Sequence, residues 1–151
     1  MYRIKTLIFA ALALLVLFAP VANAQTADLK TRGLFVNLTT DDTWSAAKAI
    51  SFAHQKALKN GHKPVAIWLN VRAVYLADKK RPSHVHGLMR DSGKSIQDML
   101  SDFMADGGTV IMCAACSKAA GLQAADYIDG VQMGTWPLVE SIPFNPDVTT
   151  L

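Results

Sequence analysis

Segments with two different apolar patterns alternate along residues 33–151, and this alternation constrains the fold more than any other feature of the sequence. Short apolar runs, typical of buried strands, are separated by longer stretches with apolar residues at helical spacing. Strands that alternate with helices form a mainly parallel sheet with helices packed on its faces. We therefore expect an open, twisted α/β sheet. The strand-like runs are Gly33–Leu38, Pro64–Asn70, Thr109–Cys113, Gly130–Gly134 and Asp147–Leu151.

The helix-like segments carry recognisable start and stop signals. A long helix is expected from about Thr43 to Asn60, because Asp41 or Asp42 can cap its start and Asn60 is followed by Gly61. A glycine in the left-handed conformation commonly ends a helix. The other segments expected to be helical are Ser95–Ala105, Cys116–Ala120 and Pro137–Ser141.

Residues 1–24 have the pattern of a cleavable secretory signal peptide. Arg3 and Lys5 start it, Leu7–Phe18 is apolar and uncharged, and Ala22-Asn23-Ala24 is a small-x-small cleavage site. The apolar run is shorter than the roughly 20 residues that cross a bilayer, which favours cleavage over an uncleaved membrane anchor. We expect a periplasmic or secreted protein with cleavage near Ala24 and no stable membrane insertion afterwards. Residues 25–32 would then link the signal peptide to a domain at 33–151.

Composition and charge narrow the classes of function. The chain is 51% hydrophobic and 18% charged, which argues against disorder. Cleavage removes the two positive charges of Arg3 and Lys5 from the formal net charge of +3 and leaves +1. No basic cluster with interleaved aromatic residues remains, and this argues against nucleic-acid binding.

The two cysteines, Cys113 and Cys116, are the strongest sign of chemistry. Cys113 ends a predicted buried strand, and Cys116 falls in the first turn of the next helix. Unpaired amide groups and the positive helix end stabilise a thiolate at such a position, and a thiolate attacks a disulfide or a sulfane sulfur. From the residues alone, an inert pair or a plain disulfide formed in an oxidising compartment stays open as the alternative.

Two histidines suggest a metal site. His84 and His86 lie in a long polar loop over residues 77–94, and alternate residues of an extended segment face the same side. If that loop folds over the end of the third strand, His84, His86, Cys113 and Cys116 would make a soft site for Cu(I) or Zn. The alternative is a pair of solvated loop histidines. No other cofactor is expected.

Other polar and aromatic residues have plainer interpretations. Helix capping explains at least one of Asp41 and Asp42. Trp136 and Pro137 follow the fourth strand and are placed either in the cleft beside the cysteines or at an oligomer contact. The remaining histidines, His54 and His62, are interpreted as surface or packing residues.

The segment GGTVIMCAACSKAAGL, followed by DYIDGVQMG, resembles the DsrE/DsrF-like family, which includes sulfur-relay proteins. GLFVNLTTDD, PVAIWLN with VRAVYLADK, and GKSIQDMLSDFMADGG resemble the family as well, so the resemblance spans nearly all of residues 33–151. It implies a three-layer α/β/α domain with a flavodoxin-like arrangement that assembles into trimers or hexamers. In the sulfur-relay members the cysteine at the position of Cys113 carries sulfur as a persulfide, and that role is transferred to Cys113 alone.

Three hypotheses on function follow. The first is an exported sulfur carrier, at most sulfurtransferase-like, with Cys113 as the persulfide site and a protein or a small sulfur compound as donor or acceptor. The second is a non-enzymatic soft-metal binding module built from Cys113, Cys116 and the loop histidines. The third is a periplasmic dithiol–disulfide redox protein that uses both cysteines. In the first hypothesis Cys116 resolves an oxidised Cys113, shields it, or acts as a second carrier.

Overall fold

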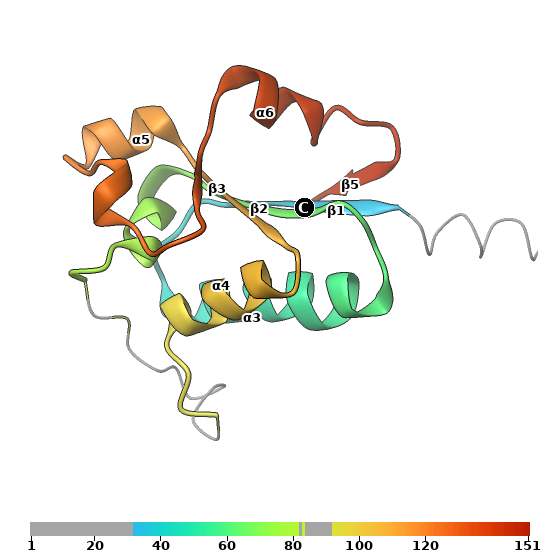
Figure 1. The fold of residues 1–151 in the computed structure, drawn as a ribbon, viewed down its shortest axis with the longest axis horizontal. Helices are drawn as coiled ribbons and strands as arrows, with labels where there is room; N and C mark the ends of the chain where they lie inside the picture. The colour runs from blue at the N-terminus through green and yellow to red at the C-terminus, as the bar shows by residue number, and fades with distance from the viewer. Residues whose placement is uncertain (1–31, 82, 84–91) are drawn as a thin grey trace, which may run out of the picture. The chain divides into compact units, whose positions relative to one another are not determined.

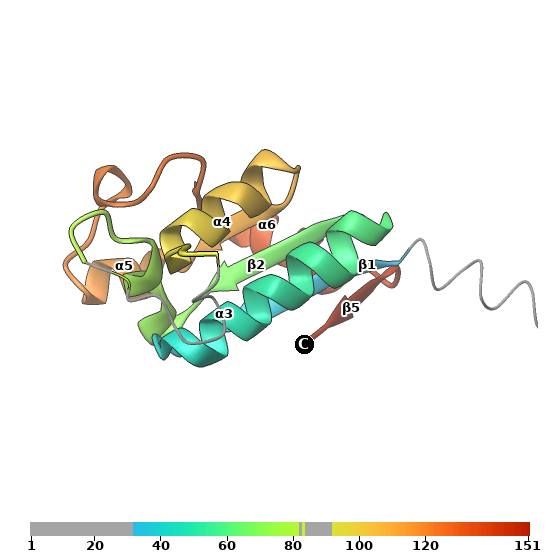
Figure 2. The same ribbon diagram turned by 90° about the horizontal axis from the view of Figure 1, so that it is seen from below.

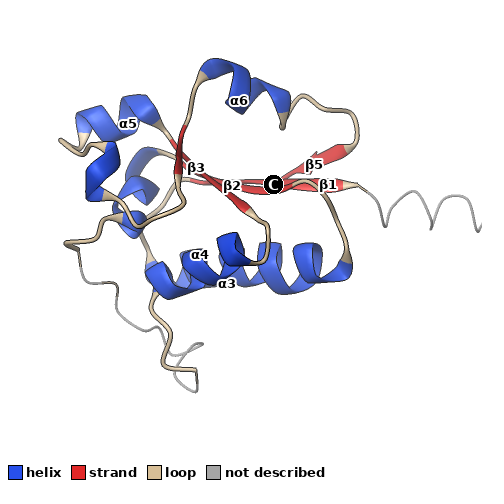
Figure 3. Cartoon of the chain, in the orientation of Figure 1, coloured by secondary structure: helices blue, strands red, loops and turns tan. Residues whose placement is uncertain are grey.

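The computed structural model describes residues 32–81, 83 and 92–151, and these contain a five-stranded sheet with strand order β4-β3-β2-β1-β5 (Figures 1 and 3). Every pair of neighbouring strands is parallel, so the predicted open parallel α/β sheet is confirmed. The carboxyl ends of neighbouring strands therefore lie at the same edge of the sheet. The strands are β1 (Gly33–Leu38), β2 (Val65–Leu69), β3 (Thr109–Met112), β4 (Gln132–Met133) and β5 (Val148–Thr150).

Helices cover both faces of the sheet. Figures 1 and 2 show α3 (Thr43–Ser51) and α4 (Ile96–Ala105) on one face and α6 (Trp136–Ser141) on the other, which gives three layers. Two further elements lie near the carboxyl edge of the sheet: α5 (Ala114–Ala119) follows β3, and the 3-10 helix η3 (Val71–Ala77) follows β2. A short 3-10 turn, η5 (Ala124–Asp126), precedes β4.

The helical segment after β1 spans the predicted range but changes its winding. It runs as α3, then as the π-helical turn η1 (Phe52–Ala57) and the 3-10 turn η2 (Leu58–Asn60). Asp42 caps its start by accepting a hydrogen bond from the Ser45 N–H at 2.8 Å, and Gly61 ends it at φ 87°. Trp44, in the first turn of α3, is 58% exposed, and the buried residues of this helix are Ala46, Ala47 and Ile50.

The main core lies between the sheet and the α3 and α4 helices. Leu100 and Phe103 of α4 are fully buried there, and burial of such a side chain contributes about 1.5–3 kcal/mol. Phe103 also explains Gly108, since a Cβ at that position would lie 2.3 Å from the Phe103 ring. A smaller cluster fills the opposite face beneath α6; its buried members are Phe35, Ala66, Ile111 and Val148.

The predicted signal peptide and all of the predicted linker except Arg32 lie outside the described residues. Among the helices that the structure describes, none has both the length and the apolar character needed to cross a membrane.

Candidate functional site

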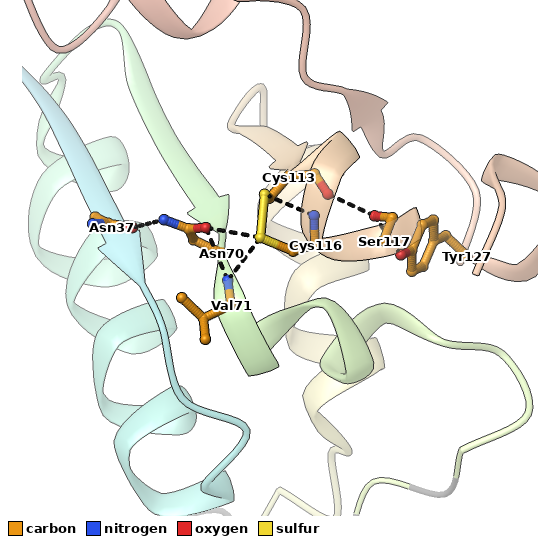
Figure 4. The surroundings of a disulfide bond; sticks show 7 residues. All are labelled: Asn37, Asn70, Val71, Cys113, Cys116, Ser117 and Tyr127. Atoms are coloured by element: carbon orange, nitrogen blue, oxygen red, sulfur yellow. Dashed lines mark hydrogen bonds between the residues drawn. A yellow bond between two sulfur atoms is a disulfide. The ribbon is translucent and has the colours of Figure 1, made fainter. Parts of the chain in front are cut away.

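Three neighbouring strands bring polar and sulfur-containing side chains together at the carboxyl edge of the sheet (Figure 4). Asn37 lies near the end of β1, Asn70 directly follows β2, and Cys113 directly follows β3. Backbone hydrogen bonds extend the ladder to these residues: the Asn70 N–H donates to the Leu38 carbonyl at 2.8 Å, and the Cys113 N–H donates to the Leu69 carbonyl at 3.0 Å. Open α/β sheets commonly place their sites at this edge.

Cys113 and Cys116 are joined by a disulfide, with their Cα atoms 5.2 Å apart (Figure 4). Cys113 is the N-cap of α5: its backbone is extended, and its Sγ accepts a hydrogen bond from the Cys116 N–H at 3.2 Å. The helix therefore begins at Ala114, two residues earlier than the sequence predicted, because a sulfur takes the role that an oxygen usually has. The two cysteines differ in exposure: Cys113 is buried, with 8% of its surface exposed, and Cys116 is half-buried.

A chain of polar contacts surrounds the Cys116 sulfur. The Val71 N–H donates to the Cys116 Sγ at 3.3 Å and to the Asn70 Oδ1 at 2.9 Å. Asn70 Oδ1 also lies 3.1 Å from this sulfur, where it would accept the thiol proton once the disulfide is reduced. Asn70 is held in turn by Asn37, whose Oδ1 accepts from the Asn70 Nδ2 at 3.3 Å. Val71 has a left-handed backbone at φ 49°, which is rare for a branched residue.

Two buried hydroxyl groups fix the backbone of Cys113 from the other side. The Ser117 hydroxyl donates to the Cys113 carbonyl at 2.8 Å, and the Tyr127 hydroxyl donates to the Ser117 Oγ at 2.7 Å (Figure 4). Burial raises the pKa of Tyr127 above its ordinary value, so the hydroxyl keeps its proton and stays a donor. This arrangement holds the turn from β3 into α5 in one conformation.

Asp41 joins two arginines beside the cysteine pair. The Arg72 Nε and Nη2 donate to its two carboxylate oxygens at 3.0 and 2.9 Å, and the Arg81 Nη2 donates at 2.8 Å. The hydrogen bonds from Arg72 lower the pKa of Asp41 to about 2, against the opposing effect of burial. Arg81 also stacks on Tyr75, 4.6 Å from the ring centroid. The sequence assigned capping to at least one of two aspartates: Asp42 caps α3, and Asp41 forms these ion pairs.

Tyr75 lines two neighbouring pockets. The first has a volume of about 300 Å³, includes Cys116, and is called the cysteine pocket below. The second has a volume of about 340 Å³ and contains the Asp41–Arg81 ion pair. One cysteine of the disulfide, Cys116, thus borders a space that can hold a small molecule. The cysteine pocket is lined by Val71, Arg72, Tyr75, Cys116, Ala119 and Ala120.

Several residues singled out by the sequence do not join this site. His84 and His86 lie outside the described residues, so the predicted Cu(I) or Zn site stays a prediction. Within residues 32–81, 83 and 92–151, no three His, Cys, Asp or Glu side chains are grouped so that they could hold a metal ion. Trp136 is 69% exposed at the start of α6, and neither it nor Pro137 lines the cysteine pocket.

The other two histidines have structural positions. His54 is buried, its Nε2 lies 2.6 Å from the Asp106 Oδ2, and its ring meets the Phe103 ring edge-on. Lys59 and His54 together lower the pKa of Asp106, with the larger effect from Lys59. The Nδ1 of His62 lies 2.7 Å from the Arg32 carbonyl oxygen. The interpretation of His54 as a packing residue is confirmed.

Sequence reasoning missed five residues around the cysteine pair: Asn37, Asn70, Val71, Ser117 and Tyr127. Asn70 had a usable signal, because a polar residue directly after a buried strand lies at the same edge as Cys113. For Ser117 and Tyr127 the sequence held no signal beyond the ordinary tendency of buried hydroxyl groups to form hydrogen bonds. Val71 contradicts local propensity, since branched residues avoid the left-handed region.

The fold and the site together define an open parallel α/β domain with a cysteine pair at the carboxyl edge of its sheet. Solved structures of similar fold include the YchN protein of E. coli, with a TM-score of 0.61 and 21% sequence identity over 80% of this chain and 99% of that one. MTH1491 of Methanobacterium thermoautotrophicum has a TM-score of 0.56 and 13% identity, and also covers 80% of this chain and 99% of that one. BT1422 of Bacteroides thetaiotaomicron has a TM-score of 0.55 and 17% identity, and covers 80% of this chain and 95% of that one.

These likenesses support the fold and nothing finer. YchN has a DsrE/DsrF-like fold, so the resemblance seen in the sequence holds at the level of the fold. MTH1491 and BT1422 are both described as proteins of unknown function. No protein-family model matches the chain, and no curated protein matches it.

Proposed function

We propose that Cys113 and Cys116 form a redox-active sulfur centre that alternates between a disulfide and a dithiol and exchanges sulfur or electrons with sulfur compounds. One observation carries the proposal: the only two cysteines of the chain meet at the carboxyl edge of the sheet, and one of them, Cys116, lines a pocket. A disulfide that closes so short a loop constrains little of the unfolded chain, so a purely structural role would contribute little stability.

The dithiol form can reduce a sulfane sulfur in two balanced steps. First, one cysteine thiolate attacks the outer sulfur of R–S–SH, which gives a cysteine persulfide and R–S⁻. Second, the other cysteine thiolate attacks the inner sulfur of that persulfide, which closes the Cys113–Cys116 disulfide and releases HS⁻. The pair is oxidised by two electrons and the sulfane sulfur is reduced by two. External thiols then restore the dithiol by ordinary thiol–disulfide exchange.

Backbone amides support both sulfurs in this cycle. The Cys116 N–H donates to the Cys113 Sγ at 3.2 Å, and the Val71 N–H donates to the Cys116 Sγ at 3.3 Å. Hydrogen-bond donors of this kind stabilise a thiolate relative to a thiol. Each sulfur thus has a donor in place for the negative charge that it carries when it attacks or leaves.

A persulfide carrier centred on Cys113 is the second candidate, favoured by the amide that points at this sulfur and by the resemblance to sulfur-relay proteins. A persulfide on Cys113 would lie within reach of Cys116, which forms a disulfide with it. A carrier must therefore pass its sulfur on before Cys116 attacks. The lifetime of the persulfide separates the two candidates.

Export would suit the redox-active form. Disulfides persist in oxidising compartments, and the signal peptide predicted over residues 1–24 would direct the protein to one. Assembly into trimers or hexamers, and soft-metal binding with His84 and His86, stay predictions.

Inorganic polysulfide under anaerobic conditions tests the proposal. The reduced wild-type protein should release about one sulfide per cysteine pair and return to the disulfide by intact mass. The Cys116→Ser variant should gain one sulfur atom and release no sulfide, and a variant with both cysteines replaced by serine should do neither. A wild-type protein that keeps an added sulfur without closing the disulfide would favour the carrier. Absence of both loading and sulfide release would reject both candidates.

A further inference from the structure

The two sulfurs of the disulfide have unequal access to a small molecule. Cys113 is 8% exposed and belongs to the main core cluster. Cys116 is half-buried and lines the cysteine pocket. A nucleophile that arrives through this pocket therefore meets Cys116 before Cys113.

The exposure of the neighbouring residues also favours Cys116. Exchange at a disulfide requires the incoming sulfur to attack from the side opposite the sulfur that leaves. Val71, which lines the pocket and is 55% exposed, lies on the side of the Cys116 sulfur away from Cys113 (Figure 4). Attack at Cys113 would instead have to reach a residue that is only 8% exposed.

The hydrogen bonds to the two sulfurs are consistent with attack at Cys116 and departure of Cys113. The sulfur that leaves would be Cys113, which accepts the Cys116 N–H at 3.2 Å, and a stabilised thiolate leaves more readily. The sulfur under attack would be Cys116, which accepts the Val71 N–H at 3.3 Å. The Cys113 sulfur, which takes up the negative charge in the first step, thus has one backbone donor, and the Cys116 sulfur has one for the second step, in which it leaves.

We infer that external thiols exchange at Cys116 and that Cys113 is the internal, leaving sulfur; this inference rests on the proposed redox function. In the reductive step, R–S⁻ attacks the Cys116 sulfur, the R–S–S–Cys116 bond forms, the Cys113–Cys116 bond breaks, and the electron pair leaves on the Cys113 thiolate. A second R–S⁻ then attacks the R sulfur, which releases R–S–S–R and the Cys116 thiolate. The assignment differs from the resemblance-based role, in which Cys113 meets the partner.

The pocket also defines the class of substrate. A volume of about 300 Å³ is at the lower end for small-molecule sites, so the pocket suits a low-molecular-weight thiol or persulfide. Val71, Ala119 and Ala120 make most of its wall apolar, and Arg72 adds a cationic side chain at 66% exposure. A small organic group attached to the reacting sulfur would be accommodated by these side chains.

Single-cysteine variants test the inference with the disulfide of 2-mercaptoethanol as the probe. Mixed-disulfide formation is followed by intact mass over a range of pH, and each rate is divided by the measured thiolate fraction. Cys113→Ser, which leaves Cys116, should react about tenfold faster or more than Cys116→Ser, which leaves Cys113. An equal or reversed ratio in variants with wild-type circular dichroism would overturn the assignment.

The wild-type protein gives a test that needs no cysteine variant. Partial reduction by 2-mercaptoethanol, followed by an acid quench, traps the mixed disulfide, and fragmentation mass spectrometry locates it. The inference predicts the adduct on Cys116, and an adduct on Cys113 overturns it while leaving the redox proposal intact. No exchange at all in the folded wild-type protein would instead reject the proposed function.

A pocket-filling variant tests the route of entry. Ala119→Leu in the Cys113→Ser background places a larger side chain in the cysteine pocket and should slow the probe severalfold. Ala115→Leu is the matched control, because Ala115 is exposed on the same helix and does not line this pocket. Equal rates in the two variants would contradict entry through the pocket.

Discussion

The backbone amide of Val71 donates a hydrogen bond to the sulfur of Cys116 at 3.3 Å, and it does so from a left-handed conformation at φ 49°. This conformation turns the chain from the end of β2 into η3, and Asn70 holds it by accepting from the same amide at 2.9 Å. A left-handed backbone costs a residue with a side chain about 1–2 kcal/mol. Conformations of this kind cluster at functional sites, and here the strained amide donates to the sulfur of Cys116, a residue that lines the pocket.

A pair of substitutions at Val71 measures this strain. Val71→Gly should be more stable than Val71→Ala by about 0.5–1 kcal/mol, because glycine adopts the left-handed region without a clash but loses more chain entropy on folding. Urea unfolding of the two variants gives the difference directly. Alanine as stable as glycine would mean that the folded protein does not hold this backbone conformation.

A negative charge at position 70 should slow exchange without removing the cap. Asn70→Asp keeps an oxygen that can accept the Val71 N–H, but places a carboxylate where the amide oxygen now lies 3.1 Å from the Cys116 sulfur. Two like charges this close repel by several kcal/mol even in a partly polar environment, so exchange should slow about tenfold or more. Asn37→Asp is the matched control, because Asn37 contacts Asn70 rather than the sulfur. Stopped-flow rates that fall equally in both variants would argue against a direct effect on Cys116.

Stability should fall in acid through Asp41. Its pKa is lowered to about 2 from an ordinary value of 3.8, chiefly by the hydrogen bonds from Arg72. A lowered carboxyl pKa stabilises the fold above the ordinary value, and this stabilisation is lost as pH falls from about 4 toward 2. The pKa values of Asp98, Asp106 and Asp126 are lowered as well, so the contribution of Asp41 is the difference between wild type and Asp41→Asn. The melting temperatures of wild type and Asp41→Asn, measured between pH 2 and 5, should converge at the acid end. Parallel curves for the two proteins would refute this stabilising role of Asp41.

The buried hydroxyl pair behind Cys113 should respond asymmetrically to substitution. Ser117→Ala leaves the Tyr127 hydroxyl buried without its acceptor, which costs about 1–3 kcal/mol. Tyr127→Phe leaves Ser117 bonded to the Cys113 carbonyl, so the loss should be only about 0.5–1.5 kcal/mol. The double variant should lose less free energy of unfolding than the two single variants together, because Tyr127→Phe removes the hydroxyl group that Ser117→Ala leaves without an acceptor. Additive losses in denaturant unfolding would show that the two hydroxyl groups act independently.

The strands of the fold were predictable from the sequence because buried parallel strands read as continuous apolar runs. Gly33–Leu38 was predicted to the residue, and the cap at Asp42 and the stop at Gly61 followed from local chemistry. The start of α5 was displaced because capping by a cysteine sulfur is not among the usual helix signals.

The surroundings of the cysteine pair were less predictable because they depend on tertiary structure. Asn70 and Val71 reach Cys116 through the register of β2 on β3, which joins residues 45 positions or more apart in the chain. The C-x-x-C spacing does not reveal which cysteine lines a pocket, since this depends on how α5 leaves the sheet. Val71 takes a conformation that its own side chain disfavours, so no local rule could predict it.

Redox titration of the folded protein tests the central claim most directly. The native protein is equilibrated with mixtures of reduced and oxidised dithiothreitol, free thiols are alkylated, and intact mass gives the oxidised fraction while circular dichroism monitors the fold. We predict reversible two-electron interconversion between the Cys113–Cys116 disulfide and the dithiol, with the fold retained throughout. A pair that is reduced only when the protein unfolds, or that does not close again on reoxidation, would contradict the account.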